Sequence, residues 1–117
     1  MVYIIRLHIR YAGFPAWFWK DERMEAMRME TAEVTVKSPL GLHGRPAAHI
    51  VKLASAYHSD VSVKNLSSGE VGDCRSILSL LVLAASQGTH LQLTAAGDDA
   101  AAALAEISAY FAAGFNE

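Results

Sequence analysis

The stretch GLHGRPAA, residues 41–48, follows an alternating apolar run and begins a run of helical periodicity. It is therefore predicted to be the point at which a strand turns into a helix. Pro46 fits the first turn of that helix, because its fixed φ suits a helix start and its missing N–H is not needed there. His43 and Arg45 then lie at the helix N-terminus, where unpaired N–H groups and the helix dipole favour an anion. This position suits a histidine that carries a phosphoryl group.

Composition narrows the class of protein. A chain of 117 residues is enough for one domain with a real core, and a net charge of −2 with a pI near 6.2 gives no electrostatic case for nucleic acid or a membrane surface. The single cysteine, Cys74, excludes an internal disulfide and is expected to be a small buried hydrophobe. Of the histidines His43, His49 and His58, the first two do not share a helix face, so we predict no metal site and no cofactor.

Residues 1–30 differ in character from the rest and are predicted to be a leader outside the domain at 31–117. The leader has neither the apolar length of a membrane span nor the order of a secretory signal. It holds all four methionines of the chain, which are Met1, Met24, Met27 and Met29. Our hypothesis is that translation begins at Met24, Met27 or Met29. The alternative is an interfacial anchor at residues 17–19, which are Trp, Phe and Trp.

The remaining chain has a regular order of strand and helix patterns. Strands are predicted at 31–37, 61–66, 70–74 and around 91–94, and helices at 46–57, from 76 to a stop at Gly88, and from 100 to about 111. This βαββαβα order predicts an α+β fold with a four-stranded antiparallel sheet and three helices on one face.

The second helix is expected to begin at Ser76, a good N-cap residue, and the third at Asp98 and Asp99. The second helix is apolar on more than one side, whereas packing on a sheet needs a single apolar stripe. We therefore expect some of Ile77, Leu78 and Leu81 to be exposed as a docking patch for a partner.

The octapeptide at residues 41–48 resembles the active-site signature of the HPr family, the histidine-phosphorylated carriers of the phosphoenolpyruvate phosphotransferase system. Two further landmarks follow in the family's order: RSIL at 75–78 and the Gln87–Gly88 helix stop. The resemblance covers residues 31–117 and implies the HPr open-faced β-sandwich. The tail at 109–117 and the leucine-rich run at 77–83 are similar to the nitrogen-type (NPr) branch. Gly44 departs from the alanine that is usual in the family, and the leader has no counterpart there.

The resemblance also implies roles. Enzyme I would phosphorylate His43 on Nδ1 at the expense of phosphoenolpyruvate, and a IIA-type protein would then receive the group, so the chain would be a stoichiometric carrier and not an enzyme. Arg45 would share the phosphoryl charge. Ser76 corresponds to the family's regulatory serine, the target of an HPr kinase/phosphatase, and a phosphate there would weaken docking without disturbing the fold. Such a carrier is expected to be a cytoplasmic monomer.

Two other readings compete with the carrier. One is a non-catalytic regulator of the same fold that acts by docking, for which His43 would be dispensable. The other is an unrelated small α+β ligand-binding domain, in which the octapeptide match is a coincidence. No Ser-His-Asp arrangement or phosphate-binding loop in the sequence points to hydrolysis or nucleotide binding.

Overall fold

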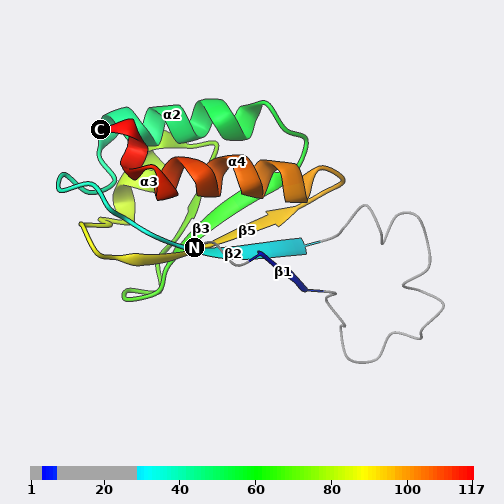
Figure 1. Ribbon diagram of the computed structural model, residues 1–117, viewed down its shortest axis with the longest axis horizontal. Coiled ribbons are helices and arrows are strands. Elements are labelled where there is room, and N and C mark those ends of the chain that lie inside the picture. Colours follow the sequence, from blue (N-terminus) through cyan, green and yellow to red (C-terminus); the bar gives the residue numbers. More distant parts are fainter. Residues whose placement is uncertain (1–3, 8–28) are drawn as a thin grey trace.

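The structure is a computed structural model that describes residues 4–7 and 29–117. Its sheet contains β1 (Ile4–Leu7), β2 (Met29–Thr35), β3 (Asp60–Asn65), β4 (Val71–Asp73) and β5 (His90–Ala96). The strands lie in the order β1-β2-β5-β3-β4, and every neighbouring pair is antiparallel. The four-stranded antiparallel sheet expected from the alternating patterns is confirmed, and β1 extends it by a fifth strand along the edge of β2 (Figure 1).

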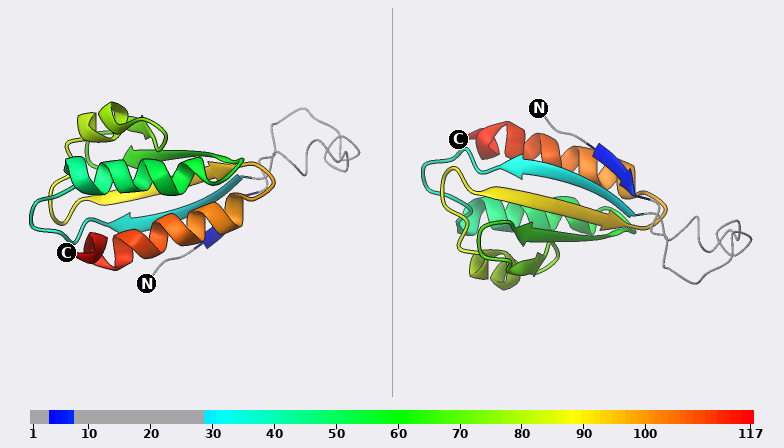
Figure 2. Two further views of the ribbon diagram at one scale, coloured as in Figure 1. Left: turned by 90° about the horizontal axis from the view of Figure 1, so that it is seen from above. Right: turned by 90° about the horizontal axis from the view of Figure 1, so that it is seen from below.

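The predicted helices are α2 (Gly44–Ser55), α3 (Ile77–Val82) and α4 (Ala100–Ala112), and a 3₁₀ turn, η2 (Gly114–Asn116), follows α4. Figure 2 shows α2 and α4 lying side by side across one face of the sheet, with the short α3 beside α2 near β4. The predicted βαββαβα order is confirmed over residues 29–112. No helix in the described ranges is long and apolar enough to cross a membrane.

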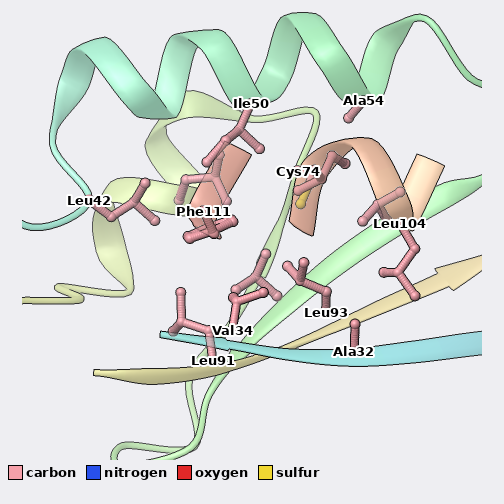
Figure 3. Close-up of a cluster of buried hydrophobic side chains, with 14 of the residues drawn as sticks. Ala32, Val34, Leu42, Ile50, Ala54, Cys74, Leu91, Leu93, Leu104 and Phe111 are labelled. Atoms are coloured by element: carbon pink, nitrogen blue, oxygen red, sulfur yellow. The ribbon is translucent and has the colours of Figure 1, made fainter. Parts of the chain in front are cut away.

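The core lies between this helical layer and the inner face of the sheet (Figure 3). The sheet contributes the alternating residues that the period of two predicts, and the helices contribute residues at three- and four-residue spacing. Buried members include Val34, Val63, Leu91, Leu93, Ile50, Leu104, Ile107 and Phe111. Cys74 is also fully buried, as expected, and burial raises the pKa of its thiol to about 12, so the group is a packing residue.

Helix α3 is shorter than predicted, because it ends at Val82 and does not run to Gly88. The next carbonyls form tertiary bonds. The Asn65 side-chain amide donates to Leu83 O (3.0 Å), and Leu42 N–H donates to Ala85 O (2.8 Å). Ala84 has a φ of +49°, which turns the chain out of the helix. The apolar run continues past the helix end because Leu83 and Ala85 are core residues of the turn.

Only part of the predicted leader at residues 1–30 lies within the described residues. Strand β2 begins at Met29, close to the predicted boundary, and residues 4–7 pair with 29–32 in register, Ile4 opposite Ala32 and Leu7 opposite Met29. The alternative start residues Met24 and Met27, and the aromatic anchor at 17–19, lie outside the described ranges.

Asp99 is the N-cap residue of α4, but its side chain does not cap that helix. Its carboxylate instead binds the turn after α2: one oxygen accepts from His58 N–H (2.8 Å), and the other from Ser59 N–H (2.8 Å) and from the Ser59 hydroxyl (2.5 Å). The hydroxyl bond, followed by the His58 bond, lowers the pKa of Asp99 to about 2. α4 begins after Asp99 as predicted, but the expected side-chain cap is not formed, and the Asp99 carboxylate joins two helix ends.

We expect Asp99→Ala to lower the free energy of unfolding at pH 7, because two backbone donors and a hydroxyl lose their acceptor. The carboxyl pKa is near 4 in an unfolded chain and lower in the fold, so its contribution is present above about pH 4 and is lost as the pH falls toward about 2. Urea unfolding at pH 7, 3 and 2 should show that the difference in unfolding free energy between wild type and variant decreases as the pH falls. Asp98→Ala is the control, because the nearest charged partner of Asp98 is His58 at 3.8 Å. An equal loss for both variants would contradict the assignment.

Candidate functional site

The loop between β2 and α2 is fixed by backbone hydrogen bonds to the turn that precedes β5. Val36 N–H donates to Thr89 O (3.0 Å), and Gly88 N–H donates back to Val36 O (2.8 Å). Farther along, Leu42 N–H binds Ala85 O at 2.8 Å, and the Leu42 side chain is buried. The residue that follows, His43, is therefore held at a defined place at the start of α2.

Gly41 makes this approach possible. Its φ is +69°, and a Cβ at this position would lie 2.6 Å from Ala85 O. Any other residue would strain the backbone and push the loop away from Ala85. Gly44 is different, since a Cβ there would meet nothing within 4 Å. The departure from the family's usual alanine thus leaves the loop geometry unchanged.

His43 is the N-cap residue of α2, with extended backbone (φ −97°, ψ −174°), and its side chain makes no capping bond to the helix. The N–H groups of Gly44 and Arg45 begin the helix, where backbone donors have no partner inside it, and Pro46 has none to offer. Both predicted residues, His43 and Arg45, therefore lie at the helix mouth, and the Arg45 side chain is exposed.

The His43 imidazole is bound on one side only. Its Nε2 lies 2.7 Å from Glu117 Oε1, and the two side chains are 32% and 26% exposed. Within the described part of the chain, Nδ1 has no hydrogen bond. The second oxygen of Glu117 accepts from the hydroxyl of Ser38 at 2.5 Å. Hydrogen bonds from Ser38 and His43, together with the positive charge of Arg45, lower the pKa of Glu117.

A left-handed turn after α4 brings Glu117 to His43. Gly114, Phe115 and Asn116 have φ values of +62°, +60° and +59°, and Phe115 is buried with its ring 5.1 Å from that of Phe111. Figure 1 shows η2 beside the start of α2. Sequence reasoning missed Ser38 and Glu117, which are 5 and 74 positions from His43, because no local pattern indicates a contact over that separation. The local sequence feature that could have indicated the turn toward His43 was Gly114.

The expected docking side chains are exposed: Ile77 by 41%, Leu78 by 75% and Leu81 by 38%. Val82 (67%) on the same helix and Leu40 (72%) in the histidine loop are exposed as well. Ser76 caps α3 as predicted, because its hydroxyl accepts from Ser79 N–H at 3.2 Å. We refer to Leu40, Ile77, Leu78, Leu81 and Val82 as the apolar patch.

His49 and His58, the other two histidines considered above, make contacts of their own. His49 is exposed on α2, and its ring lies 4.4 Å from that of Tyr110. His58 lies beside Asp98 and Asp99, and one potential metal-ligating atom from each of these side chains lies within 4.8 Å of the other two. Both oxygens of Asp99 already accept hydrogen bonds, so this group is explained as a structural junction.

Comparison with known proteins identifies the family. The family described as "PTS HPr component phosphorylation site" matches residues 30–113. The phosphocarrier protein NPr of Proteus mirabilis is 34% identical over 84 residues, which are 72% of this chain and 92% of that protein. The multiphosphoryl transfer protein of Vibrio cholerae is 35% identical over 94 residues, and these are 80% of this chain but 24% of that much longer protein.

Solved structures give the same result. The phosphocarrier protein HPr of Bacillus anthracis matches with a TM-score of 0.66 and 32% identity, covering 71% of this chain and 96% of that one. Together the fold and these relatives define a phosphocarrier protein. The chain belongs to the HPr family of the phosphotransferase system.

The two loop glycines provide a matched test of the site's framework. Gly41→Ala should lower the free energy of unfolding by at least about 1–2 kcal/mol, the cost of a left-handed conformation for a residue with a Cβ. Gly44→Ala should raise it by up to about 1 kcal/mol, because alanine favours the helix and meets no neighbour. Urea unfolding measures both. A Gly41→Ala protein as stable as the wild type would contradict the close approach to Ala85.

Proposed function

We propose that His43 accepts a phosphoryl group on Nδ1 from phospho-enzyme I and passes it to a IIA-type protein. The observation that carries this proposal is the geometry of the imidazole: Nε2 is bonded to Glu117, and Nδ1 is the nitrogen left for chemistry. A neutral imidazole is a competent nucleophile near neutral pH. The site lies at the N-terminus of a twelve-residue helix, whose free N–H groups and dipole stabilise a phosphate.

Arg45 is proposed to share the phosphoryl charge. It is the second residue of α2 and is exposed, and its positive charge contributes to the lowered pKa of Glu117. An Arg that forms paired N–H bonds to phosphate oxygens stabilises them more than a point charge would. The His43 side chain is one-third exposed, which suits a carrier that must present its phosphate to two proteins in turn.

The apolar patch is proposed to be the surface that enzyme I and the IIA-type acceptor contact. Four of its residues lie on α3, which begins after Ser76, and the fifth, Leu40, precedes His43 by three residues in the sequence. A phosphate on Ser76 would place about two negative charges beside Leu78 and oppose apolar docking. Phosphorylation of Ser76 by an HPr kinase/phosphatase is thus the regulatory part of the proposal.

The nitrogen-type branch and a cytoplasmic location complete the proposal. Curated relatives named NPr, from Proteus mirabilis and Klebsiella oxytoca, each align over 92% of their length at 34% identity. The buried thiol of Cys74, free of any disulfide, is consistent with a reducing compartment.

A docking regulator of the same fold is the second candidate. The extension of the apolar patch to Leu40 and Val82 favours it, because binding alone would explain so much exposed apolar surface. The two functions differ in what they require: a docking regulator needs the apolar patch, whereas a phosphoryl carrier needs His43.

Incubation with enzyme I and labelled phosphoenolpyruvate should give an acid-labile label on the wild type and none on His43→Ala. Arg45→Ala should slow labelling by about 10- to 100-fold, the effect of losing a charge-assisted hydrogen bond. His49→Ala is the matched control, an exposed imidazole on the same helix, and should be labelled at the wild-type rate. A wild type that stays unlabelled while folded by circular dichroism would leave the docking regulator.

Ser76→Asp should weaken enzyme I binding several-fold with the fold intact, because Asp is a good N-cap but adds charge beside the apolar patch. Ser76→Asn caps the helix without charge and serves as the control. Titration calorimetry of both variants with enzyme I measures the difference. Equal affinity of the two variants would show that charge at this position does not affect docking.

A further inference from the structure

The side chains of Ser38, Glu117 and His43 form one hydrogen-bonded chain at the site. The Ser38 hydroxyl donates to one oxygen of Glu117 at 2.5 Å, and the other oxygen lies 2.7 Å from His43 Nε2. Ser38 is itself buried, and Leu40 N–H lies 3.3 Å from its hydroxyl oxygen. Ser38 thus donates to Glu117, and the chain ends at the imidazole of His43.

We propose that Glu117 is a positioning residue for phosphoryl transfer, held by Ser38, which fixes the His43 ring with Nε2 protonated and Nδ1 as the nucleophile. The proposal rests on the carrier function proposed above. It adds to the site two residues that lie outside the octapeptide and act through His43.

The tautomer follows from the chemistry of the partners. A neutral imidazole carries one proton, and an ionised carboxylate can only accept a hydrogen bond. At 2.7 Å from Glu117 Oε1, Nε2 must therefore be the protonated nitrogen, since an unprotonated Nε2 would face the oxygen lone pair to lone pair. The nitrogen with the free electron pair is then Nδ1. This is the arrangement by which a second partner commonly sets which imidazole nitrogen reacts.

Glu117 is held ionised for this role. The hydroxyl of Ser38 and the imidazole of His43 both stabilise its charged form and lower its pKa, and Arg45 adds a positive charge nearby. Neutral pH therefore leaves Glu117 as an acceptor on both oxygens. Without Ser38, the carboxylate would keep a single contact and could rotate away from the ring.

The transfer step balances without moving a proton. The Nδ1 electron pair forms the new bond to phosphorus, and the bond from phosphorus to the donor atom of enzyme I breaks with its electron pair staying on that donor. The ring retains the Nε2 proton and becomes positively charged. Glu117 lies against this ring edge, so the charge that develops on the imidazole meets a carboxylate already in place. Delivery to the acceptor reverses these changes.

The backbone explains why this carboxylate is in position before reaction. Glu117 follows three residues with left-handed φ, and Phe115 in the middle of them is only 5% exposed and packs on Tyr110 and Phe111. Lys37 Nζ also donates to Ala112 O at 2.9 Å, which joins the histidine loop to the end of α4. The tail is thus fixed from both sides.

Nitrogen-15 NMR of the full chain and the labelling rate with enzyme I together test the role. The wild type should show a slowly exchanging Nε2 proton on His43, and Glu117→Ala should lose this signal and be labelled about tenfold more slowly. Glu117→Gln keeps an oxygen acceptor without the charge, so it should retain part of the signal and still slow labelling. Ser38→Ala should give a smaller loss of both.

Glu106→Gln is the control, because this carboxylate contacts the hydroxyl of Tyr57 and should change neither readout. If the wild type is labelled and Glu117→Ala keeps both the Nε2 proton and the rate, the positioning role is overturned and the carrier function stands. If the wild type is not labelled, the carrier function fails and this proposal fails with it.

Discussion

The hydrogen bond from Leu42 N–H to Ala85 O determines the geometry of the functional end of the molecule. It ends α3 by engaging the chain after Leu83, and it holds the residue before His43 against that turn. The bond requires Gly41, whose absent side chain lets the two backbones meet. The histidine loop and the apolar patch therefore share one rigid support, so a protein that docks on α3 finds His43 at a constant position.

The site combines groups that are individually ordinary. A helix N-terminus, an exposed arginine and a carboxylate occur in most small domains, and each stabilises charge by only a modest amount. Here the carboxylate contacts Nε2 of a single imidazole, and that histidine is the N-cap of the helix whose second residue is the arginine. The imidazole is bound at Nε2 and remains partly open to solvent. Such a site fits a group that must leave as readily as it arrives.

Most of the fold could be predicted from the sequence, because the spacing of hydrophobic residues follows the local geometry of strands and helices. The alternation through Val34, Leu91 and Leu93 predicted strands whose inner face is buried. The octapeptide predicted a helix from about Pro46, and the helix begins two residues earlier, at Gly44. Errors occurred where tertiary bonds overrode local preference. α3 stopped at Val82 because Asn65 and Leu42 bind the next carbonyls, and Asp99 left its own helix to bind the turn at Ser59. Ser38 and Glu117 could not be found, since their meeting depends on a left-handed turn that composition does not specify.

The position of Glu117 in the chain also determines when, during synthesis and folding, the site is formed. His43 is made early and Glu117 74 positions later, with β3, β4, α3, β5 and α4 between them. Contacts of this separation form late in folding, after the local elements, and synthesis proceeds from the N-terminus. A nascent or partly folded chain therefore exposes the histidine without its carboxylate. The assembled arrangement of Ser38, Glu117 and His43 is a property of the finished fold.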